Sequence, residues 1–286
     1  MSHDVDILIP TYRRPAPLAV TLTSLCAQTL PQFRVVVSDQ TEDGDPLCAD
    51  EVQAVVRLLW VQGRPVELHK HLPRRGMAEH RQYLLDEANA PYVLFLDDDL
   101  ILEPDVVQMM LDTLQEEGCG LVGCGLIGLS FLDDVRPQEQ QIEFWEGPIR
   151  PEEIRPGTPE WERYRLHNAA NLYHLQEQLG LPRFPHAGAN GKPRRVLKYR
   201  VAWVGGCVMY DRAKLCEVGG FGFWRQLPVE HCGEDVLAQQ RVMARYGGCG
   251  LLPSGVYHQE LPTTLKDRRV NAPKVLGLET PPRVEQ

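Results

Sequence analysis

The sequence predicts an α/β fold in which a mostly parallel central sheet is flanked by helices and interrupted by an irregular insertion. Three observations lead to this class. Apolar strand-like runs alternate with helical stretches up to residue 117, the order that builds a parallel sheet. Acidic residues directly follow two of these runs. Residues 131–200 then break the alternation, because 8 of the 23 prolines and 8 of the 21 aromatic residues lie there.

The first elements follow from residue type and spacing. Residues 5–10 are apolar and β-branched and stop at a proline, which indicates a buried strand followed by a turn. Residues 17–28 repeat leucine at helical spacing. Residues 33–38 form the next strand-like run and end in an acidic, turn-prone stretch. Strand, helix and strand make one unit of a parallel sheet.

The alternation continues with a helix at 77–88 and a strand at 92–96, which leads directly into three aspartates. A helix is expected over 104–117, with proline in its first turn. Ligands of such sheets bind beyond the carboxyl ends of the strands. We therefore expect Asp39 and Asp97 to Asp99 to lie together at that edge.

The second part of the chain is less regular. Within the insertion, residues 161–179 are compatible with a helix. A strand is expected at 207–210 after a glycine pair, a helix from 233 to 246, and a short strand at 255–259. We divide the chain into residues 1–125, residues 126–260 with the 131–200 insertion, and a tail, 261–286. The first two parts are expected to form one continuous domain.

Composition excludes several classes of function. The formal net charge of −9 argues against a large nucleic-acid-binding surface. No apolar stretch reaches the roughly 20 residues of a membrane span, and the first residues lack a secretory leader. The eight cysteines contain no C-x-x-C pair, so structural thiols are expected rather than a zinc site. We expect a cytoplasmic protein.

The three aspartates after the strand at 92–96 are the first candidate site. Adjacent like charges repel one another unless a cation or protons intervene. Alternation along a strand would point Asp97 and Asp99 to one side and Asp98 to the other. Carboxylates with open coordination positions suit Mg²⁺ or Mn²⁺ carrying a diphosphate. The alternative is an acidic cluster that caps the following helix.

Two further candidates lie near the carboxyl end of the sequence. Glu234 and Asp235 open a helix, where a carboxylate could accept a proton; the alternative is simple helix capping. His258 follows an apolar pair, and it is either a ligand or a buried structural histidine.

Arg13 and Arg81 are suited to pair with phosphate oxygens.

Taken in order, these motifs resemble the family 2 glycosyltransferases, which are inverting enzymes with the GT-A fold, a Rossmann-like arrangement. The resemblance spans about residues 5 to 260 except the insertion. It is carried by Ile9-Pro10-Thr11-Tyr12-Arg13-Arg14, Val36-Val37-Ser38-Asp39-Gln40-Thr41, Gly76 with Arg81, Phe95-Leu96-Asp97-Asp98-Asp99, Gly205-Gly206-Cys207-Val208-Met209-Tyr210-Asp211-Arg212, Val218-Gly219-Gly220-Phe221, Gly233-Glu234-Asp235 and His258.

The resemblance implies roles on the nucleotide side. It makes residues 1–125 the half that binds the nucleotide sugar and 126–260 the acceptor-side, catalytic half. Thr11 and Asp39 would hold the nucleoside, with Asp39 near the base, and Arg81 would approach the nucleotide. The chain departs from the family pattern at Ser38, where a second acid is common, and at Gln82, where asparagine is usual.

The resemblance also implies the chemistry. Asp97 and Asp99 correspond to the D-x-D motif, whose last aspartate reaches the metal on the diphosphate, and His258 closes the metal site. Asp235 corresponds to the catalytic base, and Glu234 orients the acceptor or the helix start. The residues assigned to substrate binding are Thr11, Arg13, Asp39, Arg81, Asp97, Asp98, Glu234 and Trp203.

The predicted reaction is a direct displacement by an acceptor hydroxyl on a nucleotide sugar, assisted by Mn²⁺ or Mg²⁺. UDP is the favoured nucleotide, with dTDP or GDP as alternatives. Two other interpretations are a sugar-phosphate nucleotidyltransferase and a non-catalytic module that binds sugar nucleotides. Trp145, Trp161 and Tyr164 either select the acceptor or form the core of the insertion.

Overall fold

The computed structural model describes residues 3–181, 195–265 and 267–278. A single eight-stranded sheet runs through it with strand order β3-β2-β1-β4-β8-β6-β9-β7. Residues 182–194 of the predicted insertion lie outside the described residues, as do residues 266 and 279–286 of the predicted tail. The strands are β1 (Val5–Thr11), β2 (Phe33–Asp39), β3 (Val66–Lys70), β4 (Tyr92–Leu96), β6 (Leu121–Gly123), β7 (Leu197–Tyr199), β8 (Cys207–Asp211) and β9 (Gly248–Leu252).

The first half of the sheet is parallel, as the strand and helix alternation predicts. Strand β1 lies between β2 and β4 and pairs in parallel with both. It is buried along its whole length, as expected for the centre of a sheet covered on both faces. Its last residue, Thr11, is opposite Asp39 at the end of β2. The carboxyl ends of these strands therefore open at one edge.

The second half of the sheet is mixed, which the sequence patterns do not reveal. Strand β8 runs antiparallel to both β4 and β6, and β7 runs antiparallel to β9. The end of the insertion thus supplies an edge strand of the main sheet. The peptide N–H of Asp97 donates to the carbonyl of Gly206 at 2.8 Å. Gly206 has φ +69°, and a Cβ there would lie 3.1 Å from the Asp97 carboxylate.

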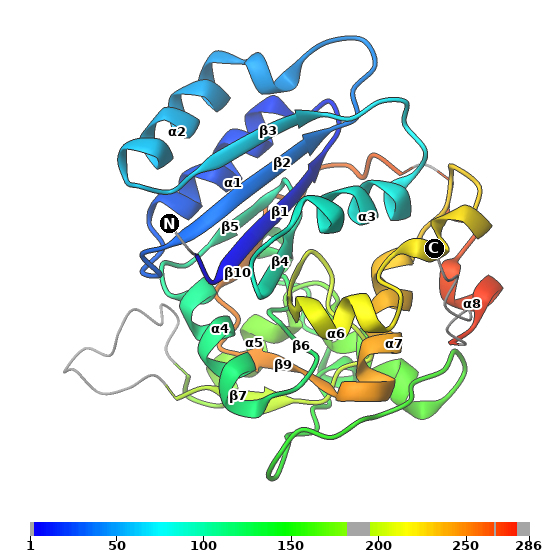
Figure 1. Cartoon of the computed structure of the whole chain (residues 1–286). Helices are drawn as coiled ribbons and strands as arrows, with labels where there is room; N and C mark the ends of the chain where they lie inside the picture. The colour runs from blue at the N-terminus through cyan, green and yellow to red at the C-terminus, as the bar shows by residue number, and fades with distance from the viewer. Residues whose placement is uncertain (1–2, 182–194, 266, 279–286) are drawn as a thin grey trace.

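Helices cover both faces of the sheet (Figure 1), and side chains alternate between two cores. Ile7 and Ile9 pack toward α1, α2 and α4, whereas Leu8 packs on the opposite side with α3 and α7. The helices are α1 (Pro15–Cys26), α2 (Asp50–Val61), α3 (Met77–Glu87), α4 (Val106–Glu117), α5 (Asn171–Gln178), α6 (Arg212–Glu217), α7 (Glu234–Tyr246) and α8 (Ala272–Leu276). None of these described helices has the length and apolarity needed to cross a bilayer.

A separate two-stranded sheet brings the carboxyl-terminal histidine to the aspartates. Strand β10 (Val256–His258) pairs antiparallel with β5 (Leu100–Leu102), so that His258 is opposite Leu100. The N–H of Gln259 then donates to the carbonyl of Asp99 at 2.8 Å. These contacts fix His258 beside the end of β4, although about 160 residues separate the two in the chain.

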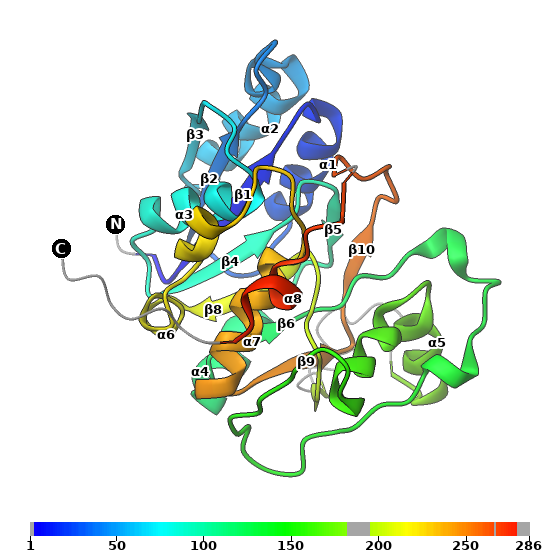
Figure 2. The ribbon, with the colours of Figure 1, turned by 90° about the vertical axis from the view of Figure 1, so that its right-hand side faces the viewer.

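The insertion does not contain the single helix expected at 161–179. A 3-10 helix (η4, Pro159–His167) is followed by α5, and the chain breaks between them at Ala169, whose φ is +49°. Other short 3-10 helices are η1 (Pro46–Cys48), η2 (Leu129–Phe131), η3 (Pro137–Glu139) and η5 (Gly222–Gln226). Helix α5 buries Leu172 and Leu175 in the core that also contains α7. Figure 2 shows α7 and α8 packed against each other on the side that faces the viewer, with α5 near β9.

Candidate active site

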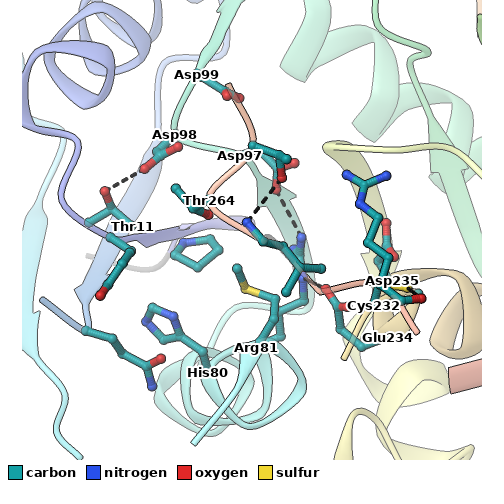
Figure 3. Close-up of a pocket in the computed structure, with 18 of the residues that line it drawn as sticks. Thr11, His80, Arg81, Asp97, Asp98, Asp99, Cys232, Glu234, Asp235 and Thr264 are labelled. Carbon is teal, nitrogen blue, oxygen red and sulfur yellow. Dashed lines mark hydrogen bonds and ion pairs between the residues drawn. The ribbon is translucent and has the colours of Figure 1, made fainter. Parts of the chain in front are cut away.

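A pocket of about 550 Å³ opens at the carboxyl ends of β1 and β4 and at the first turn of α7. Figure 3 shows segments that are distant in the sequence converging on it. Its walls contain most of the predicted residues together with several that were not predicted. The predicted residues that line it are Thr11, Arg81, Asp97, Asp98, Asp99, Trp203, Glu234, Asp235 and His258.

The three aspartates point to different partners. Asp98 accepts a hydrogen bond of 2.6 Å from the Thr11 hydroxyl. Arg14 lies 2.6 Å from a carboxylate oxygen of Asp99 and 3.3 Å from one of Asp98. Asp97 instead faces Arg81 (Figure 3). The expectation that Asp97 and Asp99 point to one side and Asp98 to the other is therefore wrong, because β4 ends at Leu96 and the chain turns at Asp98 and Asp99.

Arg81 joins the two halves of the pocket. Its guanidinium donates to Asp97 at 3.0 Å and to Glu234 at 3.1 Å, and its side chain is only 7% exposed. Burial alone would lower the pKa of Arg81, but the charges of Asp97, Glu234 and Asp235 raise it above its ordinary value. The cation thus compensates for acidic groups on both sides of the pocket.

Asp235 opens onto the pocket from the first turn of α7. Gly233 precedes the helix, and no side chain caps this end. The Glu234 carboxylate accepts a hydrogen bond from Arg81. The main contact of Glu234 is therefore with Arg81, and not a helix-capping contact. Burial and then the charge of Glu234 raise the pKa of Asp235 to about 7, although Arg81 opposes this shift. A carboxyl group with such a pKa can hold or accept a proton near neutral pH.

The loop before Asp235 is attached to the start of α3. The N–H of Ala78 donates to Nε2 of His231 at 3.1 Å, and the other ring nitrogen lies 2.7 Å from the Pro228 carbonyl. The imidazole therefore caps the helix that carries Arg81. Gly76 has φ +101°, and a Cβ there would come within 2.6 Å of the His231 ring. This close approach explains why glycine stands at that position.

His258 and Asp99 are the candidate metal ligands. Nε2 of His258 lies 3.6 Å from the nearer Asp99 oxygen. Within the described ranges, no three His, Cys, Asp or Glu side chains are grouped as a metal site. A carboxylate and an imidazole suit Mn²⁺ or Mg²⁺ when a substrate diphosphate and water complete the coordination. The donor set therefore fits a cation that is held jointly by protein and substrate.

Two contacts would have to change for a cation to bind between the Asp99 oxygen that faces His258 and Nε2 of His258. Arg14 already occupies the Asp99 oxygen that faces His258. The N–H of Glu260 donates to Nδ1 of His258 at 2.8 Å, so a neutral ring carries its proton on Nε2. Coordination through Nε2 requires that this proton move and that the Glu260 contact open.

Asp39 and Arg13 do not line the pocket. Asp39 is fully buried, where it accepts hydrogen bonds from Thr41 and forms an ion pair with Lys70 at 2.6 Å. Arg13 has φ +58° and pairs at the surface with Asp43. The next residue, Arg14, enters the pocket instead. The substrate roles assigned to Asp39 and Arg13 stay predictions.

Trp203 forms an aromatic wall that the insertion supports. The ring of Tyr164 stacks on it at 5.1 Å between centroids and 12° between planes, and Trp161 lies against it at 4.8 Å. Trp203 lines the pocket, whereas Trp161, Tyr164 and Trp145 do not. Among the described residues, Trp161 and Tyr164 of the insertion thus contact the pocket indirectly, through Trp203.

His80 is a pocket residue that was not predicted. It lies in α3, and Nε2 is 2.8 Å from the Ser38 hydroxyl. Burial lowers the pKa of His80 to about 3, so the ring is neutral over the physiological range. Ser38, at the position where the resembled family commonly has a second acid, therefore has a buried histidine as its partner. Other pocket residues outside the predicted set are Pro10, Tyr12, Arg14, Gln40, Arg74, Met77, Val229, Cys232, Gly233, Val236, Leu261, Thr263, Thr264, Leu265, Arg268 and Asn271.

Comparison with known proteins agrees with this geometry. The model of the family described as Glycosyl transferase family 2 matches residues 6–174, which is more than half of the chain. The chain belongs to glycosyl transferase family 2. This assignment favours the first interpretation of the sequence over a nucleotidyltransferase. The match includes the aspartates after β4 and ends before α7.

Two curated relatives are similar over part of their length. The succinoglycan biosynthesis protein ExoM of Rhizobium meliloti (strain 1021) is 33% identical over 121 residues, which cover 41% of this chain and 37% of ExoM. An uncharacterized glycosyltransferase of Haemophilus influenzae is 28% identical over 112 residues, covering 39% and 35%. The matches thus span little more than a third of each relative.

Solved structures share the fold. S. aureus TarS 1-349 in complex with UDP-GlcNAc has a TM-score of 0.55 at 16% identity, over 93% of this chain and 60% of TarS. The mannosyltransferase PcManGT from Pyrobaculum calidifontis, in complex with GDP-Man and Mn²⁺, has a TM-score of 0.53 at 16% identity, covering 93% and 59%. These likenesses confirm the expected GT-A fold.

Replacing Arg81 with methionine is expected to destabilise the protein by about 3 to 5 kcal/mol near pH 8, since the buried Glu234 carboxylate loses its compensating charge. Without that charge, the folded-state pKa of Asp235 should rise further above its ordinary value, because Arg81 no longer opposes the shift. The destabilisation should therefore shrink as the pH falls and Asp235 becomes protonated. Urea unfolding at several pH values measures both effects.

Arg74→Met is the matched control, because Arg74 pairs with Glu230 at an exposed position. Loss of such a pair costs about 1 kcal/mol or less. Equal destabilisation by the two substitutions would contradict the role given to Arg81.

Proposed function

We propose that this protein transfers a sugar from a nucleoside-diphosphate sugar to an acceptor hydroxyl group, with inversion at the anomeric carbon and with help from a divalent cation. The observation that carries the proposal is the convergence of Asp97, Asp99 and Asp235 on one pocket across Arg81. Family membership supports glycosyl transfer. UDP-GlcNAc in TarS and GDP-Man in PcManGT support a nucleotide-sugar donor.

Asp235 is the proposed general base. It is the pocket carboxyl for which no ion pair is recorded within the described residues, whereas Glu234 is held by Arg81. As a carboxylate it would accept the proton of the acceptor hydroxyl while that oxygen attacks the anomeric carbon. Inversion requires the nucleoside diphosphate to leave from the opposite face of the sugar.

The nucleotide would occupy the side of the pocket formed by Thr11 and the aspartates. Asp99 and His258 would hold Mn²⁺ or Mg²⁺ there. When bound, such a cation stabilises the negative charge that develops on the leaving diphosphate. Arg14 would orient Asp98, and Arg81 would keep Asp97 and Glu234 at a fixed separation.

Trp203 is the proposed wall for a sugar. Aromatic faces pack well against the apolar faces of sugar rings. The Trp203 side chain is held by Tyr164 and Trp161, so its orientation depends on the insertion. We propose that the insertion influences the choice of acceptor through this contact.

Replacing Asp235 with asparagine should reduce turnover by about 10²- to 10⁴-fold, because an amide cannot accept the proton. Nucleotide binding should persist. Release of nucleoside diphosphate from a panel of UDP-sugars and GDP-mannose with Mn²⁺ measures turnover, and a thermal shift measures binding. Asp112→Asn, on an exposed face of α4, is the control. Turnover of the Asp235 variant close to that of the control would reject the assignment.

Activity is expected to rise with pH through about 7. The pKa of Asp235 is raised to about 7 by burial and by Glu234, so protons block the base below that value. In this range kcat/KM should fall about tenfold for each pH unit. Glu234→Gln removes a repelling charge and should move the midpoint to lower pH. A profile that is flat from pH 5 to 9 would contradict the prediction.

Asp99→Ala should weaken nucleoside-diphosphate binding in the presence of Mn²⁺ and leave the weaker metal-free binding nearly unchanged. The reason is that Asp99 would contribute through the cation. Calorimetry with UDP and with GDP, each with and without Mn²⁺, measures both. The idea fails if the Asp99 variant loses the same affinity in the absence of metal.

A further inference from the structure

Residues 259–265 and 267–271, here together called the strap, contribute to the pocket wall between β10 and α8. It is fixed at one end by the hydrogen bond from the Gln259 N–H to Asp99 and by a hydrogen bond from Arg14 to the Pro262 carbonyl. At the other end, the N–H of Cys232 donates to the Val270 carbonyl at 2.9 Å. The strap lies beyond the residues matched by the family model, 6–174. Thr264, on the strap, is seen inside the pocket in Figure 3.

More carboxyl groups than guanidinium groups line the pocket, and this imbalance of charge disfavours binding of an anionic substrate. Five carboxyl groups line it, compared with four guanidinium groups. Three of these arginines are already engaged: Arg81 by Asp97 and Glu234, Arg14 by Asp98 and Asp99, and Arg74 by Glu230. Their positive charge is largely neutralised before any substrate arrives.

Arg268 is the remaining guanidinium of the pocket. In the part of the chain that the structure describes, no carboxylate lies within ion-pair distance of it. Its backbone is held in place, because its carbonyl accepts a hydrogen bond of 3.6 Å from the Cys232 thiol. Cys232 is three residues before Asp235. Arg268 is thus attached to the catalytic side of the pocket with its donors available.

We infer that Arg268 binds the diphosphate of the nucleotide-sugar donor. This inference rests on the proposed function and adds a residue to it. A planar guanidinium can form two parallel hydrogen bonds to phosphate oxygens. Arg268 is a strap residue, and no ion pair with a pocket carboxylate is found for it among the described residues. Its guanidinium is therefore available to a phosphate group.

The neighbouring residue is a matched comparison. Arg269 carries the same charge and is exposed, as Arg268 is, but it pairs with Asp267 at 2.9 Å. It does not line the pocket. Removing either arginine changes the net charge of the protein equally, so a difference between them reports on the pocket and not on general electrostatic attraction.

The test uses calorimetry with UDP and GDP, each with Mn²⁺, and with the corresponding monophosphates. Arg268→Gln should weaken binding of the diphosphate by about tenfold, the usual effect of losing a charge-assisted contact. The loss should be smaller for the monophosphate. Arg268→Lys should recover part of the affinity, and Arg269→Gln should leave it unchanged. Unfolding temperatures confirm that all variants are folded.

The outcomes separate the two proposals. If the wild-type protein binds a diphosphate and Arg268→Gln binds it equally well, the inference about Arg268 is wrong and the proposed function stands. The same holds if both glutamine variants lose affinity equally. If the wild-type protein binds neither UDP nor GDP, both the inference and the proposed function are rejected.

Discussion

The ion pairs of Arg81 with Asp97 and Glu234 are the interaction on which the site depends. Five carboxyl groups share one pocket, and like charges at such distances repel unless cations lie between them. Arg81 lies between the aspartates after β4 and the acids that begin α7, and it has almost no contact with water. It therefore lowers the electrostatic cost of bringing the two acidic segments together. Asp235 is left without a recorded ion pair among the described residues, with a pKa raised to about 7.

The fold supports this arrangement by connecting distant segments. His231 attaches the loop before α7 to the start of α3, so Arg81 and Asp235 are carried by elements that contact each other. The small β5–β10 sheet places His258 beside Asp99. Beyond the residues matched by the family model, α7 and the strap complete the pocket with Asp235 and Arg268.

Sequence patterns predicted that the aspartates after the strands lie at one edge of the sheet, because the carboxyl ends of parallel strands share that edge. They predicted the strand at 207–210 but not its antiparallel direction, since an apolar run has the same appearance in a parallel and in an antiparallel strand. They singled out Arg13 for the site, whereas the left-handed backbone at Arg13 brings Arg14 into the pocket. Asp39 stood at the expected strand end, but Lys70 from a strand that was not predicted engages it. Nothing local marks residues 263–265 or Arg268 as parts of a pocket wall, because that role depends entirely on tertiary contacts.

A crystal structure of the Asp235→Asn protein with Mn²⁺ and a nucleotide-sugar donor would test the central claim most directly. The account predicts a metal ion coordinated by Asp99 and the diphosphate, with the sugar between that ion and residue 235. A donor bound elsewhere, or one whose anomeric carbon lies far from residue 235, would contradict it.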